Sequence, residues 1–397
     1  MINVTPPTVP DSDAARQFAL WNLGFRPFYL LAGMFATLGI ALWTVQTAGW
    51  LGARSIVAGP LWHAHEMLFG YAFAVIVGFL FTAVRNWTNL PTPSGAALAA
   101  IATLWICARV LAITPYALAA AAFDVVFALA AATGIAAPLL RSRNRRNYLF
   151  IVLLLGLGLA NLAFHIGMAG AFDLPLRLGL QTGLDIVLLI MVIMAGRVIP
   201  MFTMNGVRGV SCRRVPVVER LAPTSVVALL ASHLFTAPAI IIASVAGFAA
   251  IVHGVRLILW RPWRTLGTPI VWILHFSYGW IVIALALHAL AAWDLVPASV
   301  ATHAITVGAI GGMTLGMMTR TTRGHTGRPL ESSRAEVFCY IAIQLAAAVR
   351  VFGPLTSPSL YLQSIIASGF LWSMSFGVFT VTYWPILSRP RIDGRPG

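Results

Sequence analysis

The sequence predicts an all-α, polytopic integral membrane protein, a single bundle of about twelve transmembrane helices. Composition is the first observation: 59% of the 397 residues are hydrophobic and only 9% are charged, whereas a soluble domain carries about 25% charged residues. The second is that apolar runs long enough to cross a bilayer, roughly 20 residues each, recur from Tyr29 almost to the C-terminus. The third is the placement of arginine between these runs. Lipid is therefore the expected solvent for most of the chain.

Scanning by that length predicts twelve spans, which are residues 26–48, 60–84, 96–114, 117–140, 147–170, 177–201, 220–237, 239–260, 268–292, 297–318, 335–353 and 359–387. The weakest boundary lies at Pro238, where a three-residue link separates the seventh and eighth spans. If those two spans formed one helix, the count would be eleven. The expected organisation is a cytoplasmic segment at 1–25, one membrane domain at 26–387 and a cytoplasmic tail at 388–397.

Arginine placement predicts the orientation of the spans. The net charge is +15 and the chain has no lysine. The links after even-numbered spans and the tail are rich in arginine, namely Arg85, Arg141, Arg143, Arg145, Arg146, Arg208, Arg213, Arg214, Arg220, Arg261, Arg264, Arg320, Arg323, Arg328, Arg334, Arg389, Arg391 and Arg395. The links after odd-numbered spans hold only Arg54 and Arg177. Because basic residues gather in cytoplasmic loops, both termini are expected in the cytoplasm of a bacterial inner-membrane protein.

The same arginine pattern favours twelve spans over eleven, since an odd count would break the alternation. It also argues against nucleic-acid binding, because the arginines form no basic stripe with interleaved aromatics on a soluble module. The three cysteines, Cys107, Cys212 and Cys339, are far apart and show no CxxC spacing. They therefore support neither a disulfide framework nor a thiolate zinc site.

Histidine is the best candidate for chemistry, because ionisable groups inside a membrane are costly and usually functional. Neutral imidazole also ligates haem iron and copper. Six of the nine histidines are predicted at one depth, toward the periplasm, and these are His63, His65, His165, His233, His288 and His303. His253 and His275 fall nearer the cytoplasm, and His325 lies in a cytoplasmic loop. The clustering predicts a metal or haem site, although a chance distribution can also produce it.

The run Trp62-His63-Ala64-His65-Glu66 opens the second span. Residues two apart on a regular helix point about 200° apart, so one ion cannot easily take both rings. Either the helix begins irregularly here or the two rings serve different centres. Glu66 can orient a ring or carry protons. The alternative is an interfacial belt of polar residues at a helix start.

Five histidines have weaker arguments. His275 and His288 each have a ligand interpretation and a structural one of similar weight. His233 and His253 have no polar neighbours in sequence and are interpreted as structural. His303 precedes a run of glycines, which lets helices or a flat ring approach closely.

The loop from Arg320 to Arg328, which contains His325, is dense in hydrogen-bond donors. It can bind haem propionates or another anion through charge-assisted hydrogen bonds, or it can hold lipid phosphates. Near the end of the sixth span, Pro200 is expected to break the helix.

Two acidic residues, Asp124 and Asp185, lie within predicted spans. Asp185 is a candidate for a proton path or an ion pair. Arg109 and Arg350 are possible partners, but one sequence does not show the pairing.

Five stretches resemble motifs of the NnrS family of bacterial membrane proteins, in the family's order. They are residues 24–28 (GFRPF), 62–67 (WHAHEM), 82–88, 196–203 (GRVIP with FT) and 324–328 (GHTGR). The run around Arg85 and Asn89 departs from the family pattern. The resemblance implies a twelve-helix protein that binds haem b and copper and takes part in nitric oxide metabolism and resistance to nitrosative stress. It implies no ligand set.

The resulting hypothesis is a haem–copper protein that binds nitric oxide and reduces it, with Glu66 as the catalytic proton carrier and a quinol or another donor supplying electrons. Residue type and depth suggest as cofactor-binding residues His63, His65, His165, His275, His303, Arg320, His325 and Arg328. They suggest as metal ligands His63, His65, His165, His288 and His303. Two alternatives stay open: a non-catalytic nitric oxide binder or sensor, and a secondary transporter, which twelve spans and cytoplasmic termini also fit.

Overall fold

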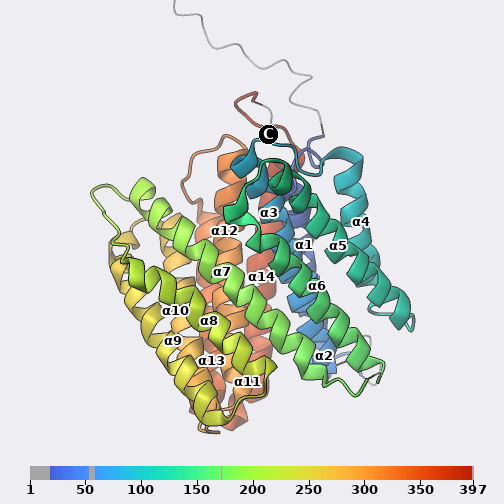
Figure 1. The fold of residues 1–397 in the computed structure, drawn as a ribbon, viewed down its shortest axis with the longest axis vertical. Coiled ribbons are helices and arrows are strands. Elements are labelled where there is room, and N and C mark those ends of the chain that lie inside the picture. The colour runs from blue at the N-terminus through green and yellow to red at the C-terminus, as the bar shows by residue number, and fades with distance from the viewer. Residues whose placement is uncertain (1–17, 53–58, 171, 396–397) are drawn as a thin grey trace, which may run out of the picture.

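The computed structural model describes residues 18–52, 59–170 and 172–395. Arg54 and most of the N-terminal segment lie outside the described residues. The helices within these ranges are α1 (Phe25–Thr47), α2 (Gly59–His65), η2 (Glu66–Ala72), α3 (Phe73–Thr88), α4 (Gly95–Leu111), α5 (Ala117–Arg141), η3 (Arg145–Asn147), α6 (Leu149–Met168), α7 (Leu176–Gly206), α8 (Pro216–Leu234), α9 (Ala239–Leu259), η4 (Pro262–Thr265), α10 (Pro269–Ala291), α11 (Ala298–His303), η5 (Ala304–Gly311), α12 (Gly312–His325), α13 (Arg334–Thr356), η6 (Pro358–Leu360) and α14 (Tyr361–Ser388) (Figure 1).

The predicted all-α membrane fold is confirmed. Within the described ranges, eleven helical rods are long and apolar enough to cross a membrane. The remaining predicted span, the third (residues 96–114), corresponds to α4, an apolar helix of 17 residues that ends at Leu111. It is shorter than expected because the chain turns at Ala112 to Thr114 before α5 begins.

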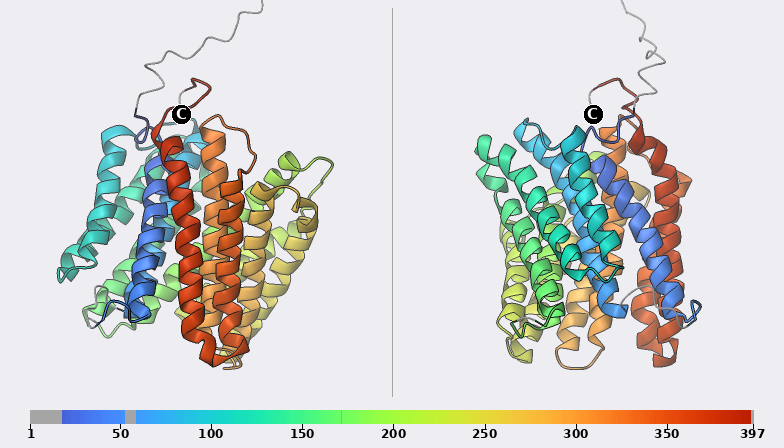
Figure 2. Two further views of the ribbon diagram at one scale, coloured as in Figure 1. Left: turned by 180° about the vertical axis from the view of Figure 1, so that it is seen from behind. Right: turned by 90° about the vertical axis from the view of Figure 1, so that its right-hand side faces the viewer.

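The start of α1 and the end of α14 lie close together at one end of the bundle. The backbone N–H of Ala19 donates to the carbonyl of Ser388 at 2.8 Å, and α1 packs along α14. Figure 2 shows the start of α1 and the end of α14 at the same end of the molecule. An even number of crossings follows. Which side of the membrane this face meets stays a prediction.

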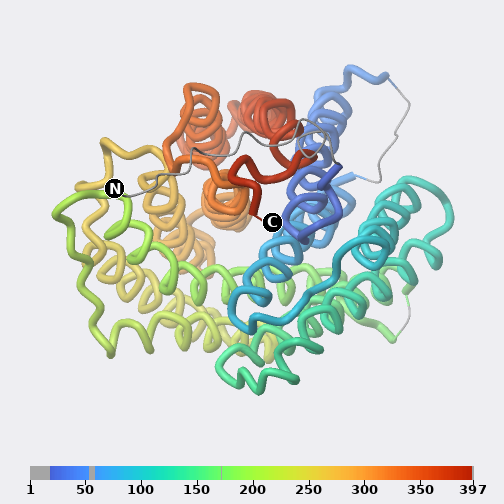
Figure 3. The backbone as a smooth tube through the Cα atoms, turned by 90° about the horizontal axis from the view of Figure 1, so that it is seen from above, coloured from blue at the N-terminus to red at the C-terminus, as the bar shows by residue number. Residues whose placement is uncertain are grey.

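Successive helices are neighbours, and the pairing of α1 with α14 closes them into a ring (Figure 3). Four spans are the most enclosed: in their most apolar windows, 89% of Gly59–Thr88, 72% of Leu176–Gly206 and 67% each of Pro269–Ala291 and Ala298–His325 are buried. Most predicted site residues lie on these four spans. The other spans are less enclosed, with at most half of their most apolar windows buried.

The alternative in which the seventh and eighth spans form one helix is wrong, because α8 ends at Leu234 and α9 begins at Ala239. Between them Thr236 takes a left-handed conformation with φ of 47°. Pro238 follows, and it has no N–H with which to continue the helix.

The expected break at Pro200 is also wrong, because α7 runs unbroken to Gly206. Proline removes one backbone hydrogen bond but is tolerated in transmembrane helices, where packing and side-chain hydroxyls support the turn. Here the Thr203 hydroxyl donates to the Ile199 carbonyl at 2.8 Å.

Two spans contain π-helical segments directly after a histidine. η2 follows His65, and η5 follows His303. A π-helical turn shifts the direction of the side chains around it and is frequent at functional sites. The hydroxyls of Tyr71 and Thr314 join the two spans at 2.6 Å. The irregular helix that the sequence allowed near His65 is therefore present.

Candidate functional site

A buried polar cluster lies where α2, η2, α4, α5 and α6 meet. Its members are His65, Glu66, Arg109, Asp124, Asn161 and His165, all on rods that pack against one another. Four of them, His65, Glu66, Asp124 and Asn161, are at most 4% exposed. Because α2 begins and α6 ends at the end of the bundle away from the C-terminus, the cluster lies toward that end (Figure 1).

Arg109 bridges two carboxylates in this cluster. One guanidinium nitrogen lies 2.9 Å from Glu66 Oε1, and another donates to Asp124 Oδ1. The second oxygen of Asp124 lies 3.0 Å from His165 Nε2. Two carboxylates against one guanidinium leave a surplus of one negative charge if both imidazoles are neutral. A buried uncompensated charge is costly, so the cluster favours one further cation or proton.

His65 lies at the centre of this cluster. Its Nδ1 lies 2.9 Å from Glu66 Oε1, and its Nε2 lies 2.8 Å from the Asn161 side-chain oxygen and 3.6 Å from Asp124 Oδ2. These oxygen atoms surround the ring at the place where the two carboxylates gather, and such a surrounding suits a bound cation.

The same residues fit a metal ion. One ligand atom each from His65, Asp124 and His165 lie within 4.8 Å of one another. Two imidazoles and one carboxylate suit copper, zinc or non-haem iron and leave coordination positions open. Glu66 contacts His65 from outside this set, as a carboxylate that orients a ligating ring does.

A second histidine pair joins α8 to α10. His233 Nε2 lies 2.9 Å from His288 Nε2, and His233 Nδ1 lies 2.6 Å from Asp185 Oδ2. Gln181 donates to the other oxygen of Asp185 at 3.1 Å. No arginine pairs with Asp185 in the part of the chain that the structure describes. His233 is interpreted as structural from its sequence neighbours, and its polar partners come from α7 and α10 instead.

His63 and His303 form a third group at the same end of the bundle. His63 stacks on Trp43 with ring centroids 4.9 Å apart, and its Nδ1 is buried without a hydrogen-bond partner. His303 Nδ1 donates to the Ser299 carbonyl at 2.6 Å, which leaves the lone pair of Nε2 free. The charge of Arg350 acts on both rings, and one of its terminal nitrogens is buried and unpaired.

His63 and His65 therefore serve different groups, which was one of the two possibilities that their spacing allowed. Two other histidines lie apart from all three groups. His275 Nε2 bonds the Thr203 hydroxyl at 2.8 Å, while its Nδ1 is buried without a partner. Both nitrogens of His253 are satisfied, by the Tyr278 hydroxyl at 2.5 Å and the Ala222 carbonyl at 3.2 Å. His253 is thus a structural residue.

Arg320 and His325 lie on α12 at the other end of the bundle, whereas His303 lies at the end of α11, near the start of the same span. They line a cavity of about 360 Å³ between α3, α7 and α12. Arg328 follows in the loop after α12 and does not line this cavity. The structure thus separates these three predicted cofactor-binding residues from the histidine groups.

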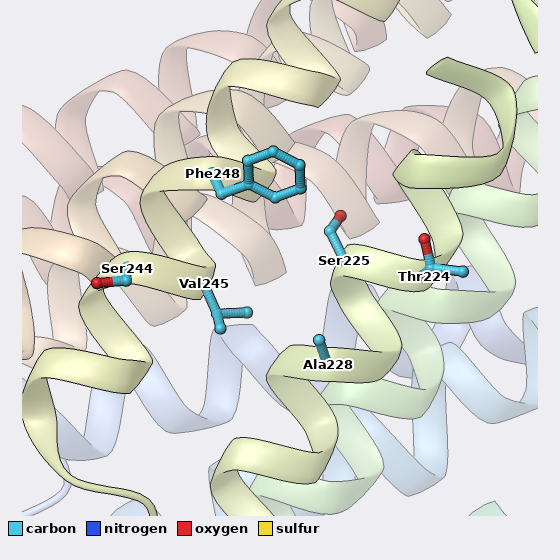
Figure 4. A pocket seen from close by; sticks show the side chains of 6 residues that line it. All are labelled: Thr224, Ser225, Ala228, Ser244, Val245 and Phe248. Carbon is cyan, nitrogen blue, oxygen red and sulfur yellow. The ribbon is translucent and has the colours of Figure 1, made fainter. Parts of the chain in front are cut away.

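A further shallow pocket opens between α8 and α9 (Figure 4). Its walls are Thr224, Ser225, Ala228, Ser244, Val245 and Phe248. None of these is titratable or metal-binding, so the pocket carries no candidate chemistry.

Asn161 was not predicted from the sequence, and Arg109 was one of two possible partners for the buried acidic residues. Arg109 pairs with Asp124, 15 residues away across the short α4–α5 link, and also with Glu66. Arg109 and Asp124 are both charged residues inside apolar helices. This shared feature could have identified them as a pair from the sequence. Asn161 stands in an apolar run without such a pattern.

Comparison with known proteins agrees with the motifs. The family model described as NnrS protein matches residues 19–391, nearly the whole chain. No curated protein matches the chain.

Proposed function

The chain belongs to the NnrS family, and from this premise we propose that it is a bacterial inner-membrane protein that binds nitric oxide at protein-bound copper and b-type haem. In this proposal it acts in nitric oxide metabolism and in resistance to nitrosative stress. Nitric oxide is small, neutral and soluble in lipid, so it needs no channel to reach a buried site.

The observation that carries the proposal is the arrangement of His65, Asp124 and His165, three convergent ligand atoms in a cluster with surplus negative charge. Copper ligated by imidazole nitrogen would neutralise that charge. Arg109 fixes Asp124 from the opposite side, so the carboxylate is oriented before an ion arrives.

Haem is best supported near His63 and His303. The free lone pair of His303 Nε2 and the unpartnered His63 Nδ1 are available to iron. The terminal nitrogen of Arg350 that lacks a partner would bind a propionate. Bound haem would supply an iron position at which nitric oxide binds. In the chain itself, Trp43 orients the His63 ring by stacking on it.

One feature favours reduction over simple capture. Reducing two molecules of nitric oxide to nitrous oxide and water consumes two electrons and two protons, so the site must deliver protons. Glu66 Oε2 is buried without a partner, while Oε1 contacts His65 and Arg109. We therefore retain Glu66 as the proposed proton carrier to the cluster. The two π-helical segments do not support a transporter, because their backbones stay helical rather than unwound.

The test uses two reciprocal variants of the purified full-length protein. Copper and iron content and the visible spectrum, oxidised and reduced, with and without nitric oxide, are measured on each sample. His165→Gln should lose most of the copper and keep the haem. His303→Gln should lose haem absorption and keep the copper. Each variant serves as the folding control for the other.

Full retention of both cofactors in both variants would overturn the site assignments. A colourless, metal-free wild-type protein from cells that make haem would overturn the function itself. Nitrous oxide formation with an added quinol separates an enzyme from a binder, and Glu66→Gln should slow that turnover while leaving the nitric oxide spectral shift intact.

A further inference from the structure

Two sequence motifs that the proposed function does not use meet on the face where the chain ends lie. The Phe25 ring of the first motif contacts the His325 ring of the last, with centroids 5.6 Å apart. Arg26 lies close enough to Arg328 for their charges to repel. Positive charge from the first and the last of these motifs therefore gathers at one place.

Arg26 is fully buried, although it has no acidic partner. One of its terminal nitrogens donates to the carbonyls of Leu387 and Arg389, at 2.9 and 2.7 Å. Its Nε and other terminal nitrogen are buried without partners. An unpaired buried guanidinium is costly, so these donors point to a missing acceptor.

Arg320 on α12 is likewise a buried arginine without an acidic partner. It is 5% exposed, and its guanidinium lies 3.9 Å over the Phe202 ring. One terminal nitrogen has no partner, and neither does one of Arg328. Over the described ranges, no carboxylate lies within 4.0 Å of Arg26, Arg320 or Arg328, since none forms an ion pair.

The nearby acidic groups are already engaged. Glu336 accepts both ends of the Arg323 fork, at 2.6 and 2.7 Å, and also bonds Tyr383. Asp393 is held by Arg391. The described part of the chain thus leaves unsatisfied guanidinium nitrogens on three arginines, Arg26, Arg320 and Arg328.

The adjoining cavity defines what kind of anion fits. Arg320 and His325 lie on its wall, and the rest of that wall is largely apolar, with Met194, Val198 and Phe202 from α7. Thr82 also lines it and accepts the Phe25 N–H at 3.2 Å, which connects the cavity to the Arg26 motif. A ligand with an anionic head and an apolar body matches this lining.

We propose that Arg26, Arg320 and Arg328 bind the phosphate of an anionic phospholipid, with an acyl chain in the cavity between α3, α7 and α12. The site lies at the ends of α1, α12 and α14, where spans reach the head groups, and on the arginine-rich face that anionic lipid attracts. Guanidinium groups bind phosphate through charge-assisted hydrogen bonds.

The experiment measures thermal unfolding of delipidated full-length protein in a neutral detergent, titrated with phosphatidylglycerol. Separate arms use phosphatidylcholine and inorganic phosphate. Phosphatidylglycerol should raise the Tm of the wild type in a saturable way, and the other two should not. Arg320→Gln and Arg328→Gln should each weaken the apparent affinity roughly tenfold, in line with the loss of one charged hydrogen bond. Arg334→Gln, an exposed arginine on the same face, should change nothing.

Three outcomes would overturn the proposal. Equal stabilisation by inorganic phosphate would identify a site for the free anion. Loss of haem from Arg320→Gln with an unchanged lipid response would identify a propionate site. The third concerns an Asp11→Asn/Asp13→Asn variant. If this variant loses stability and its Tm does not respond to lipid, the chain's own carboxylates occupy the arginine site instead of a lipid. Arg320→Lys keeps the charge and guards against a variant that fails to fold.

Discussion

Charge balance explains why single residues matter in the cluster around Arg109. Its guanidinium lies between Glu66 and Asp124 and pairs with both carboxylates. Gly70 leaves space for this side chain, since a Cβ at that position would lie 2.7 Å from an Arg109 nitrogen. Removing one member of such a buried network leaves another charge unpaired. That penalty far exceeds the value of the same pair on a surface.

Asp124→Asn is predicted to be strongly destabilising and to abolish copper binding. The amide keeps the shape but removes the charge that faces Arg109 and His165. Breaking a buried pair costs about 3–5 kcal/mol. Thermal unfolding and copper analysis of the purified variant check this. Asp294→Asn, at an exposed turn outside the helices, is the matched control and should match the wild type in both. Normal copper content in Asp124→Asn would exclude the carboxylate as a ligand.

Helix packing places the histidines, and small residues decide how close the helices come. Gly179 on α7 faces α6, where a Cβ would lie 2.5 Å from the Ala160 carbonyl oxygen and 2.6 Å from the Phe164 nitrogen. Backbone atoms cannot move aside as a side chain can. Asn161 and His165 of the candidate site lie on this same stretch of α6. The α6–α7 contact therefore sets the position of two site residues.

Gly179→Ala is predicted to separate α6 from α7 and to lower both Tm and copper content. Gly254→Ala on α9 is the control, because its Cβ would meet only Val282 at 3.7 Å, an ordinary contact. Alanine stabilises a helix interior by roughly 0.5–1 kcal/mol relative to glycine, so the control should be as stable as the wild type or slightly more stable. Equal behaviour of the two variants would contradict the close approach of α6 and α7.

Glu336 links the last helices of the ring near the chain ends. Its carboxylate on α13 binds Arg323 of α12 and Tyr383 of α14, and it completes a capping box with Ser333. One side chain thus joins three helices on the face where α1 meets α14.

Glu336→Gln is predicted to reduce stability by about 3–5 kcal/mol, because Arg323 loses its charge partner in a partly buried site. The readout is the Tm in detergent. Asp393→Asn is the control, since that carboxylate is exposed on the tail, and the Tm should not change. The hydrogen bond from Arg391 lowers the pKa of Asp393 to about 2. The contribution of this pair is present above the usual pKa and is lost only as the pH falls through about 2, so it is constant near neutral pH. A larger effect from Asp393→Asn than from Glu336→Gln would contradict this ranking.

The candidate site shows how far residue type and depth carry a prediction. The common depth of six histidines follows from span length and arginine placement alone. Their grouping does not, because the partner of each ring comes from another helix. His233 shows this clearly: its stretch of sequence indicates no partner, yet Asp185 and His288 lie at 2.6 and 2.9 Å.

The sequence by itself determined the solvent of this protein, the number of its helical rods and the family to which it belongs. Those properties depend on runs of apolar residues, on arginine between them and on local motifs. The tertiary structure alone decided which helices touch, that Pro200 stays within α7, and that Arg109 joins two carboxylates. In a membrane, lipid-facing and protein-facing surfaces are both apolar, so hydrophobic periodicity does not mark the buried face. Only the packed helices show which polar groups share a site.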